Sequence, residues 1–281
     1  MTLRDLLATE RPLVMPGAHD AISARLIQRA GFKAYFIGGF PLVGARYAVP
    51  DIGLMGLGEI GAGMRDTIAA SNLPVLVDGD NGYGDAKTIV HTLHFYERLG
   101  AQGIMFEDQV SPKRCGHMQG KAVIPVEQME SRIRAVAQNR IDPATFILAR
   151  TDARDLEGLD GAFRRAERYL RAGADGLFIE SPRSVEELAQ IGEKFDVPQM
   201  ANMLEGGRTP ILPPAELGQL GFRIALYGIS LLMQAVRRMQ EVLTSLAEGR
   251  VDFVGHGIGF EDYKSLVDFD MWAGIEDRYR H

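Results

Sequence analysis

The fold is indicated by one stretch of the sequence, Arg98-Leu99-Gly100-Ala101-Gln102-Gly103-Ile104-Met105-Phe106-Glu107-Asp108. An arginine precedes Gly100, which is the pattern expected where a helix ends in a left-handed glycine cap. The apolar run Gly103–Phe106 then predicts a buried strand. Glu107 and Asp108 follow at the carboxyl end of that strand. The stretch therefore reads as the end of a helix, a core strand and an acidic strand end.

The same unit recurs along the chain. Similar helix-ending phrases occur at Arg29–Phe32, Arg171–Ala174 and Gln219–Phe222. Short apolar runs lie at 13–15, 34–37, 74–77, 103–106, 146–149, 176–179, 198–201 and 224–227. Segments with helical periodicity follow them at about 20–30, 58–71, 87–100, 126–139, 159–172, 184–195, 213–220 and 230–247.

Eight near-continuous apolar strands with helical crossovers predict a closed (β/α)₈ TIM barrel. An open, doubly wound sheet is the alternative, because periodicity does not reveal closure. It is disfavoured because no Gly-x-Gly-x-x-Gly follows the first strand. The segment after 248 follows the eighth strand–helix unit and is not part of the predicted barrel. Its sequence predicts one or two extra amphipathic helices.

Length and composition fit a single enzyme domain. The 281 residues are 46% hydrophobic, and 31 Lys and Arg against 37 Asp and Glu give a net charge of −6. This balance disfavours nucleic acid or an anionic membrane as a partner. One cysteine excludes an intrachain disulfide, and we find neither a signal peptide nor an 18-residue apolar run. We expect a cytoplasmic protein.

Carboxylates follow two neighbouring strands. Asp78 and Asp80 come after the third apolar run, and Glu107 ends the fourth. In a barrel these strand ends meet on one rim, where three carboxylates repel one another unless a hard cation neutralises them. Mg²⁺ is the expected ion, with Mn²⁺ possible. The alternative is that some of these carboxylates cap the following helices.

The loop after the fourth strand carries the only cysteine. Lys113 and Arg114 precede Cys115, and cationic neighbours favour a thiolate. Cys115 is therefore placed to act as an acid, a nucleophile or a ligand, the alternative being a small apolar residue. Gly116 gives the loop freedom to serve as a lid. His117 either orients a substrate oxygen, pairs with a carboxylate or is an ordinary loop residue.

Arg150 ends the fifth strand. Its guanidinium is suited to clamp a substrate carboxylate, and a buried ion pair with Glu180 is the alternative.

With these residues assembled, the chain resembles the isocitrate lyase / phosphoenolpyruvate mutase superfamily from about Pro12 to residue 247. The motifs that carry the resemblance are Val49–Gly53, Val77–Gly84, Glu107–Gln109, Lys113–His117, Ala149–Ala153 and Ala201–Met203.

The resemblance implies an architecture and an assembly. It implies a barrel over 1–247 and a helical extension over 248–281 that packs on a partner subunit. The eighth helix would be exchanged between the subunits of a dimer, and two such dimers would form a homotetramer.

The resemblance also implies roles for the site residues. Asp78, Asp80 and Glu107 would hold Mg²⁺, some of them through water. Cys115 would protonate the departing enolate, as in the carbon–carbon lyases of the superfamily. Asp51 would lie on the side of the base. Arg150 and the backbone amides of Gly38 and Gly39 would hold the C1 carboxylate of the substrate. The remaining members of the implied substrate and catalytic set are Asn202, His117, Lys113 and Glu180.

Finer motifs point to one branch of the superfamily. Gly116–Lys121, Glu180–Arg183 and Asn202–Pro210 are similar to the branch that contains 2,3-dimethylmalate lyase and the petal-death oxaloacetate hydrolase. Two segments depart from the family pattern at the pocket, Gly38–Pro41 and Tyr227–Ser230.

We therefore expect a Mg²⁺-dependent carbon–carbon lyase. Its substrate would be a substituted 2-hydroxy dicarboxylate of the 2,3-dimethylmalate or 2-methylisocitrate type, cleaved to a 2-oxo acid such as pyruvate and a carboxylic acid. The alternative is an oxaloacetate hydrolase that gives oxalate and acetate. A non-catalytic barrel used as a binding protein is more remote, because a scaffold has no need to gather the carboxylates, Arg150 and Cys115.

Overall fold

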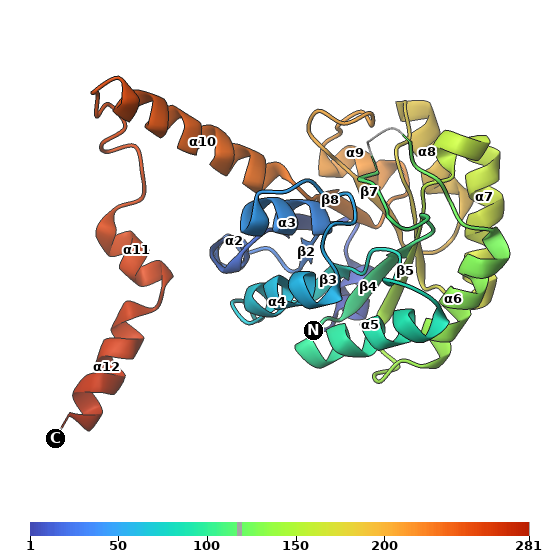
Figure 1. Cartoon of the computed structure of the whole chain (residues 1–281), viewed down its shortest axis with the longest axis horizontal. Coiled ribbons are helices and arrows are strands. Elements are labelled where there is room, and N and C mark those ends of the chain that lie inside the picture. The colour runs from blue at the N-terminus through green and yellow to red at the C-terminus, as the bar shows by residue number, and fades with distance from the viewer. Residues whose placement is uncertain (117–119, 281) are drawn as a thin grey trace. The chain divides into compact units, whose positions relative to one another are not determined.

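The computed structural model describes residues 1–116 and 120–280, and its centre is a closed barrel of eight parallel strands (Figure 1). The strands are β1 (Leu13–Ala18), β2 (Tyr35–Ile37), β3 (Val75–Asp78), β4 (Gly103–Glu107), β5 (Phe146–Thr151), β6 (Gly176–Ile179), β7 (Gln199–Asn202) and β8 (Ile224–Tyr227). Pairing of β1 with β8, from Leu13 opposite Ile224 to Pro16 opposite Tyr227, closes the sheet. The expected TIM barrel is confirmed, and the open sheet is excluded.

Helices follow the strands in the expected alternation. They are α2 (Ala21–Arg29), α3 (Gly39–Tyr47), α4 (Leu57–Ile68), α5 (Ala86–Leu99), α6 (Val126–Gln138), α7 (Arg154–Ala172), α8 (Val185–Lys194), α9 (Pro214–Gln219) and α10 (Ser230–Ala247). Gly100 and Gly173 adopt φ angles of 97° and 109° and end α5 and α7, as the helix-ending phrases predict. Within α7 the backbone leaves the helical region at Gly158, so the regular part begins close to the predicted start.

Two helices were not predicted from periodicity. Helix α1 (Leu3–Thr9) precedes the barrel, and α3 begins at Gly39, directly after β2. The Leu3, Leu6 and Leu7 side chains of α1 are buried and belong to the same apolar cluster as the inward-facing residues of the barrel. Helix α1 is too short for a clear period, and its role is to cover that cluster.

Side chains alternate along each strand between the barrel interior and the surrounding helices. The interior cluster includes Leu76 on β3, Met105 on β4 and Leu148 on β5. Their neighbours Val77, Ile104, Phe106, Ile147 and Ala149 belong instead to the cluster shared with the helices. This two-residue period decides which strand-end side chains enter the site.

The chain divides into two compact units, residues 1–232 and 233–281. The second contains most of α10, together with α11 (Phe260–Leu266) and α12 (Phe269–Tyr279), so helices are present after 248 as expected. Apolar side chains of this unit are unusually exposed, including Leu243 at 63%, Phe260 at 77% and Trp272 at 63%. A single chain does not test the expected exchange of the eighth helix.

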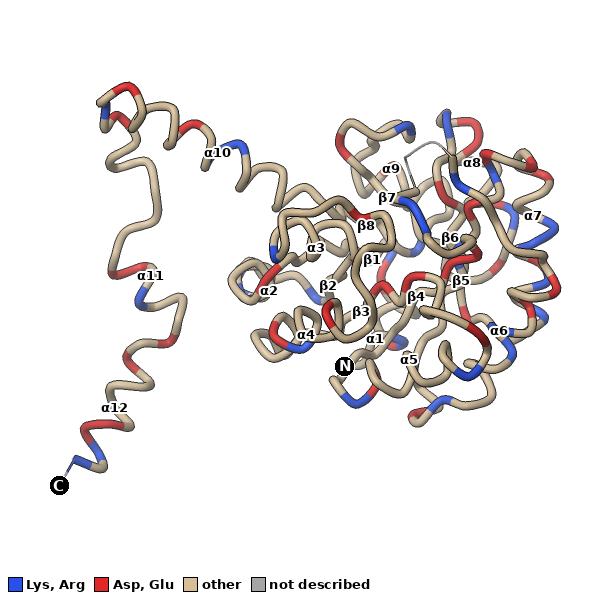
Figure 2. Tube along the Cα trace, in the orientation of Figure 1, with Lys and Arg blue, Asp and Glu red and all other residues tan. Residues whose placement is uncertain are grey.

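Acidic and basic positions are interspersed along the helices of the barrel rather than gathered by sign (Figure 2). Within the described residues, no helix combines the length and apolar character needed to span a bilayer.

Candidate active site

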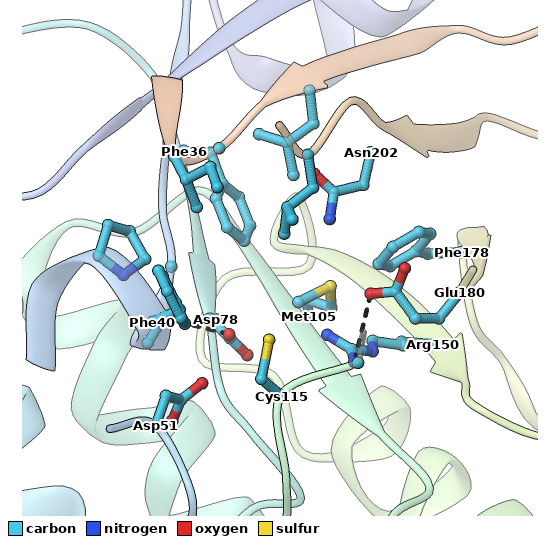
Figure 3. A pocket seen from close by; sticks show the side chains of 18 of the residues that line it. Phe36, Phe40, Asp51, Asp78, Met105, Cys115, Arg150, Phe178, Glu180 and Asn202 are labelled. Carbon is cyan, nitrogen blue, oxygen red and sulfur yellow. Dashed lines mark hydrogen bonds and ion pairs between the residues drawn. The ribbon is translucent and has the colours of Figure 1, made fainter. Parts of the chain in front are cut away.

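One layer of side chains lies directly above the apolar interior, at the carboxyl ends of the strands. Because side chains point inward at every second position, the residue two beyond each inward-facing apolar residue also points inward. The six pairs are Leu76 and Asp78, Met105 and Glu107, Leu148 and Arg150, Phe178 and Glu180, Met200 and Asn202, and Leu226 and Gly228. Except for Glu107, the upper members line one pocket, as Figure 3 illustrates for Asp78, Arg150, Glu180 and Asn202.

Lys113 is the cation on the acidic side of this pocket. Its Nζ lies 2.6 Å from Oδ1 and 2.7 Å from Oδ2 of Asp51, and 2.7 Å from Oδ1 of Asp80. Burial opposes the charge on Lys113, but the surrounding carboxylates, led by Asp80 and Asp51, raise the pKa of its ammonium well above the usual value. Lys113 therefore acts as a fixed positive charge rather than as a base.

Asp78 is buried beside Asp80 and the start of α3. Its Oδ2 accepts a hydrogen bond from the amide of Gly39 at 3.2 Å, and its Oδ1 accepts one from the amide of Asp80 at 3.0 Å. Burial and then the neighbouring Asp80 carboxylate raise the pKa of Asp78 to about 6. The Gly39 amide, assigned to the substrate carboxylate by resemblance, thus contacts Asp78 here.

Arg150 binds carboxylates on three sides. It donates to Asp152 from Nε at 2.9 Å and from Nη2 at 3.1 Å, and these atoms lie 3.3 Å from Glu107 and Glu180, respectively. The guanidinium also lies over the Phe178 ring, 5.4 Å from its centroid. The ion pair with Glu180 that the sequence left open is present. Asp152 was not among the predicted site residues, although it lies in the Ala149–Ala153 motif.

Asp108 differs from the adjacent Glu107 in the direction of its side chain. It follows Glu107 and points outward, where Thr151 Oγ1 donates to it at 2.7 Å and Tyr169 OH at 2.8 Å. Arg165 Nη1 lies 3.4 Å from the same carboxylate. Asp108 therefore joins β4, β5 and α7 outside the pocket.

The carboxylates expected to bind Mg²⁺ are those of Asp78, Asp80 and Glu107. Within residues 1–116 and 120–280, no three His, Cys, Asp or Glu side chains are arranged to hold a metal ion directly. Glu107 Oε1 is buried and has no hydrogen-bond partner among the described residues, and burial raises the pKa of Glu107 well above its usual range. Mg²⁺ keeps several waters and needs only one or two direct carboxylates. The donor set fits a hydrated ion.

The charge balance of the site supports the same fit. The described part of the site gathers six buried carboxyl groups and three buried cations. The acids are Asp51, Asp78, Asp80, Glu107, Asp152 and Glu180, and the cations are Lys113, Lys121 and Arg150. Such an excess of negative charge in a desolvated site is costly unless a further cation binds or protons remain bound.

Cys115 lies at the centre of the pocket. Its sulfur points into the cavity in Figure 3, with Asp78 on one side and Arg150 on the other. Gly116 passes so close to the Arg150–Glu180 pair that an added Cβ would lie 2.5 Å from Arg150 Nη2 and Glu180 Oε2. A larger residue at 116 would have to displace this buried ion pair. His117, the remaining predicted catalytic residue, lies outside the described residues.

Part of the pocket wall is apolar. Phe40, Pro41, Leu204 and Ile229 form this apolar wall, and Gly228 lines the same pocket. A Cβ at Gly228 would meet Leu226 at 3.6 Å and Asn202 Oδ1 at 3.7 Å, which is ordinary contact. Both segments that depart from the family pattern thus reach the pocket, as expected.

The family model for phosphoenolpyruvate phosphomutase matches residues 3–247. The chain belongs to the phosphoenolpyruvate phosphomutase family. This confirms the expected superfamily.

Curated relatives of this family member cover nearly all of the chain. It is 38% identical to 2,3-dimethylmalate lyase of Eubacterium barkeri, over 99% of this chain and 96% of the relative. It is 35% identical to the petal death protein of Dianthus caryophyllus, over 100% and 89%. A 2-methylisocitrate lyase of Halalkalibacterium halodurans is 37% identical, over 85% and 79%. The expectation of an enzyme, a lyase of this superfamily, is confirmed.

Solved structures of the family are also close to this chain. An oxaloacetate acetylhydrolase bound to 3,3-difluorooxalacetate has a TM-score of 0.92 at 28% identity, covering 98% of this chain and 95% of that one. A phosphonopyruvate hydrolase in complex with oxalate and Mg²⁺ has a TM-score of 0.88 at 26% identity, covering 99% and 98%.

Proposed function

We propose that this protein is a Mg²⁺-dependent carbon–carbon lyase that cleaves 2-alkyl or 2,3-dialkyl malates, with 2,3-dimethylmalate as the model substrate. The products would be pyruvate or a related 2-oxo acid and a short carboxylic acid. The observation that carries the proposal is the position of Cys115, whose sulfur faces a pocket lined both by carboxylates and by an apolar wall.

Asp78, Asp80 and Glu107 would hold the Mg²⁺. When bound, the ion would lower the pKa of the substrate's C2 hydroxyl and neutralise carboxylate charge. Three observations support this assignment: Glu107 Oε1 has no hydrogen-bond partner within residues 1–116 and 120–280, the pKa of Asp78 is raised, and buried acids outnumber buried cations.

The substrate would lie between Arg150 and the Asp51 side of the pocket. Arg150 and the Gly38 amide would orient the C1 carboxylate. The Gly39 amide would join them by exchanging its hydrogen bond to Asp78 for one to the substrate. Asp51, or a carboxylate beside it, would accept the proton of the C2 hydroxyl. Burial raises the pKa of Asp51, partly offset by Lys113, and this makes Asp51 a better proton acceptor than an exposed carboxylate.

Cleavage of the C2–C3 bond requires an acceptor for its electron pair. The C2 oxygen forms a carbonyl as the C2–C3 bond breaks, and the electron pair of that bond passes into the carboxylate on C3 to give an enediolate. Asn202, His117 and Lys113 would stabilise this charge. Cys115 would donate its proton to the carbon of the leaving fragment, which departs as a carboxylic acid.

Gly228 and the apolar wall support an alkylated substrate over oxaloacetate. Hydrolysis of oxaloacetate needs a polar partner for the second hydroxyl of the hydrated ketone, and Gly228 offers no side-chain donor. Phe40 and Pro41 would contact a methyl group, worth roughly 1 kcal/mol or a several-fold preference. Oxaloacetate hydrolysis stays the second candidate, because an oxaloacetate acetylhydrolase is among the most similar folds.

The assembly is proposed on similar grounds. The exposed apolar residues of α10–α12 would pack on a second copy of the chain, giving helix-exchanged dimers that pair into a tetramer. We also propose a cytoplasmic location.

The test of the proposed reaction is kcat/KM on three substrates with Mg²⁺: 2,3-dimethylmalate, 2-methylisocitrate and oxaloacetate. We expect 2,3-dimethylmalate to lead. Oxalate formation from oxaloacetate that outruns both lyase reactions would overturn the choice.

A matched variant sharpens this comparison. Because a Cβ at 228 makes only ordinary contacts, Gly228→Ser should fold and supply the missing hydroxyl. We expect it to lower kcat/KM for 2,3-dimethylmalate and raise it for oxaloacetate. An unchanged ratio of the two values would contradict the role given to Gly228.

A further inference from the structure

Lys121 is a buried cation that the proposed chemistry does not use. Its side chain is 2% exposed, and its Nζ donates to the carbonyl oxygen of Gly116 at 2.5 Å. The same Nζ lies 3.0 Å from Asp152 and 3.3 Å from Asp155. A lysine is rarely buried so completely unless its charge is paired and hydrogen-bonded.

The Gly116 carbonyl has a second buried donor. Ser181 is fully buried, and its hydroxyl donates to this oxygen at 3.0 Å. Ser181 adopts a φ of 60°, a backbone conformation that non-glycine residues seldom adopt. Two side chains from different loops thus converge on one peptide group next to Cys115.

The other face of Gly116 is fixed by the Arg150–Glu180 pair. An added Cβ would lie 2.5 Å from Arg150 Nη2 and Glu180 Oε2, so the backbone at 116 lies directly against this pair. Asp152 links the two sides, because its carboxylate accepts hydrogen bonds from Arg150 and from Lys121. The position of the peptide is therefore coupled to the position of the guanidinium.

We propose that Lys121 is a positioning residue. It holds the Cys115–Gly116 segment against Arg150 and Glu180 through the Gly116 carbonyl and the shared Asp152 carboxylate, with Ser181 as the second anchor. As a consequence, the Cys115 sulfur and the Arg150 guanidinium keep a fixed separation. This inference rests on the proposed function where it concerns proton donation, but its first test does not require turnover.

Lys121→Met is the informative substitution because it removes the ammonium group and keeps an unbranched side chain that is one atom shorter. Asp152 would retain its two hydrogen bonds from Arg150. Asp155 would retain Arg183 and Arg208, each at 2.9 Å. No buried carboxylate is left without a cation, so the variant should fold. Lys87→Met is the matched control, since that side chain is 89% exposed.

The first readout is alkylation of Cys115 by iodoacetamide, followed by mass spectrometry of the intact chain. Cys115 is the only cysteine, so each label reports on this one site. Rates are compared at their high-pH limit, where the thiol is fully ionised. We expect Lys121→Met to react about tenfold faster or more, because the segment opens more often. Lys87→Met should match the wild type.

If Lys121 served only to stabilise the fold, a different result is expected. Lys121→Met would then have a lower Tm, and the limiting alkylation rate of the folded variant would equal that of the wild type. That outcome would overturn the proposal. If Lys121→Met does not fold, Ser181→Ala decides. A limiting rate raised several-fold supports the proposal, and an unchanged rate contradicts it.

The second readout separates kcat from KM for the lyase reaction. We expect Lys121→Met to lower kcat about 10–100-fold and to change KM by less than about threefold, because misplacing a proton donor by about 1 Å can cost that much in rate. If alkylation changes as expected while the wild type cleaves no dicarboxylate, the proposed function fails and the positioning role stands.

Discussion

Glu107 on β4 and Arg150 on β5 are register partners in the barrel, and Arg150 Nε lies 3.3 Å from Glu107 Oε2. This ion pair uses one oxygen of the carboxylate, and the part of the chain that the structure describes offers no hydrogen-bond partner to the buried Oε1. One oxygen of the carboxylate is therefore paired with Arg150, and the hydrogen-bonding capacity of the other is unused by the described residues.

The first prediction concerns this free oxygen and Mg²⁺. Glu107→Gln keeps the shape of the side chain and removes its charge, so we expect Mg²⁺ affinity, measured by calorimetry, to fall about tenfold or more. The exposed Glu193→Gln serves as the control and should bind as the wild type does. Full turnover of the wild type in excess chelator would contradict the metal assignment.

The second prediction concerns the proton donor. Cys115→Ser should bind substrate as the wild type does and lose about 10²–10⁴-fold in kcat, because a hydroxyl is a much weaker acid than a thiol. Equilibrium binding and steady-state kinetics measure the two effects separately. A wild-type rate would make the cysteine structural and remove the basis for the lyase mechanism.

The third prediction concerns the pH dependence of stability without metal. Asp78 has a pKa of about 6 in the folded chain against 3.8 when unperturbed, so between these values the folded state binds more protons than the unfolded state. Stability should therefore fall as pH rises from about 4 to 6, by about 3 kcal/mol for this group.

Denaturant unfolding of wild type and Asp78→Asn, in chelator at pH 4.5 and 7.5 (both values chosen to bracket the shifted pKa), measures this effect. The wild type should lose more free energy of unfolding between the two conditions than the variant. Equal losses would contradict the assigned shift. Added Mg²⁺ should restore stability to the wild type at the higher pH.

The fourth prediction concerns assembly. Trp272 is the only tryptophan and is 63% exposed in the single chain. If α10–α12 pack on a second copy, its fluorescence should be blue-shifted and should move to the red on dilution as the oligomer dissociates. Light scattering should give a tetramer at micromolar concentration. A monomer with an emission maximum independent of concentration would contradict the exchange of helices.

The fold and much of the site could be predicted because both depend on short-range periodicity. Alternation placed Asp78, Glu107 and Arg150 at strand ends, and their convergence follows from barrel closure. Helix α1 was missed because its seven residues do not give a clear helical period.

The ion-pair pattern could not be predicted in the same way. Lys113 contacts Asp51 across 62 positions of sequence, and Lys121 contacts Asp152 across 31. Such contacts depend on how loops fold over the rim, which leaves no local pattern. In the sequence, the only indication of a role for Lys121 is its nearness to Cys115. The only indication for Asp152 is its place in the Ala149–Ala153 motif.

The most direct test of the lyase claim is cleavage of 2,3-dimethylmalate with Mg²⁺ in D₂O, followed by NMR. The mechanism predicts equal amounts of pyruvate and propionate, with one deuterium at C2 of the propionate, because Cys115 exchanges with solvent before it protonates that carbon. Cys115→Ser should form both products far more slowly. Intact 2,3-dimethylmalate after prolonged incubation with wild type, alongside rapid release of oxalate from oxaloacetate, would contradict the lyase account.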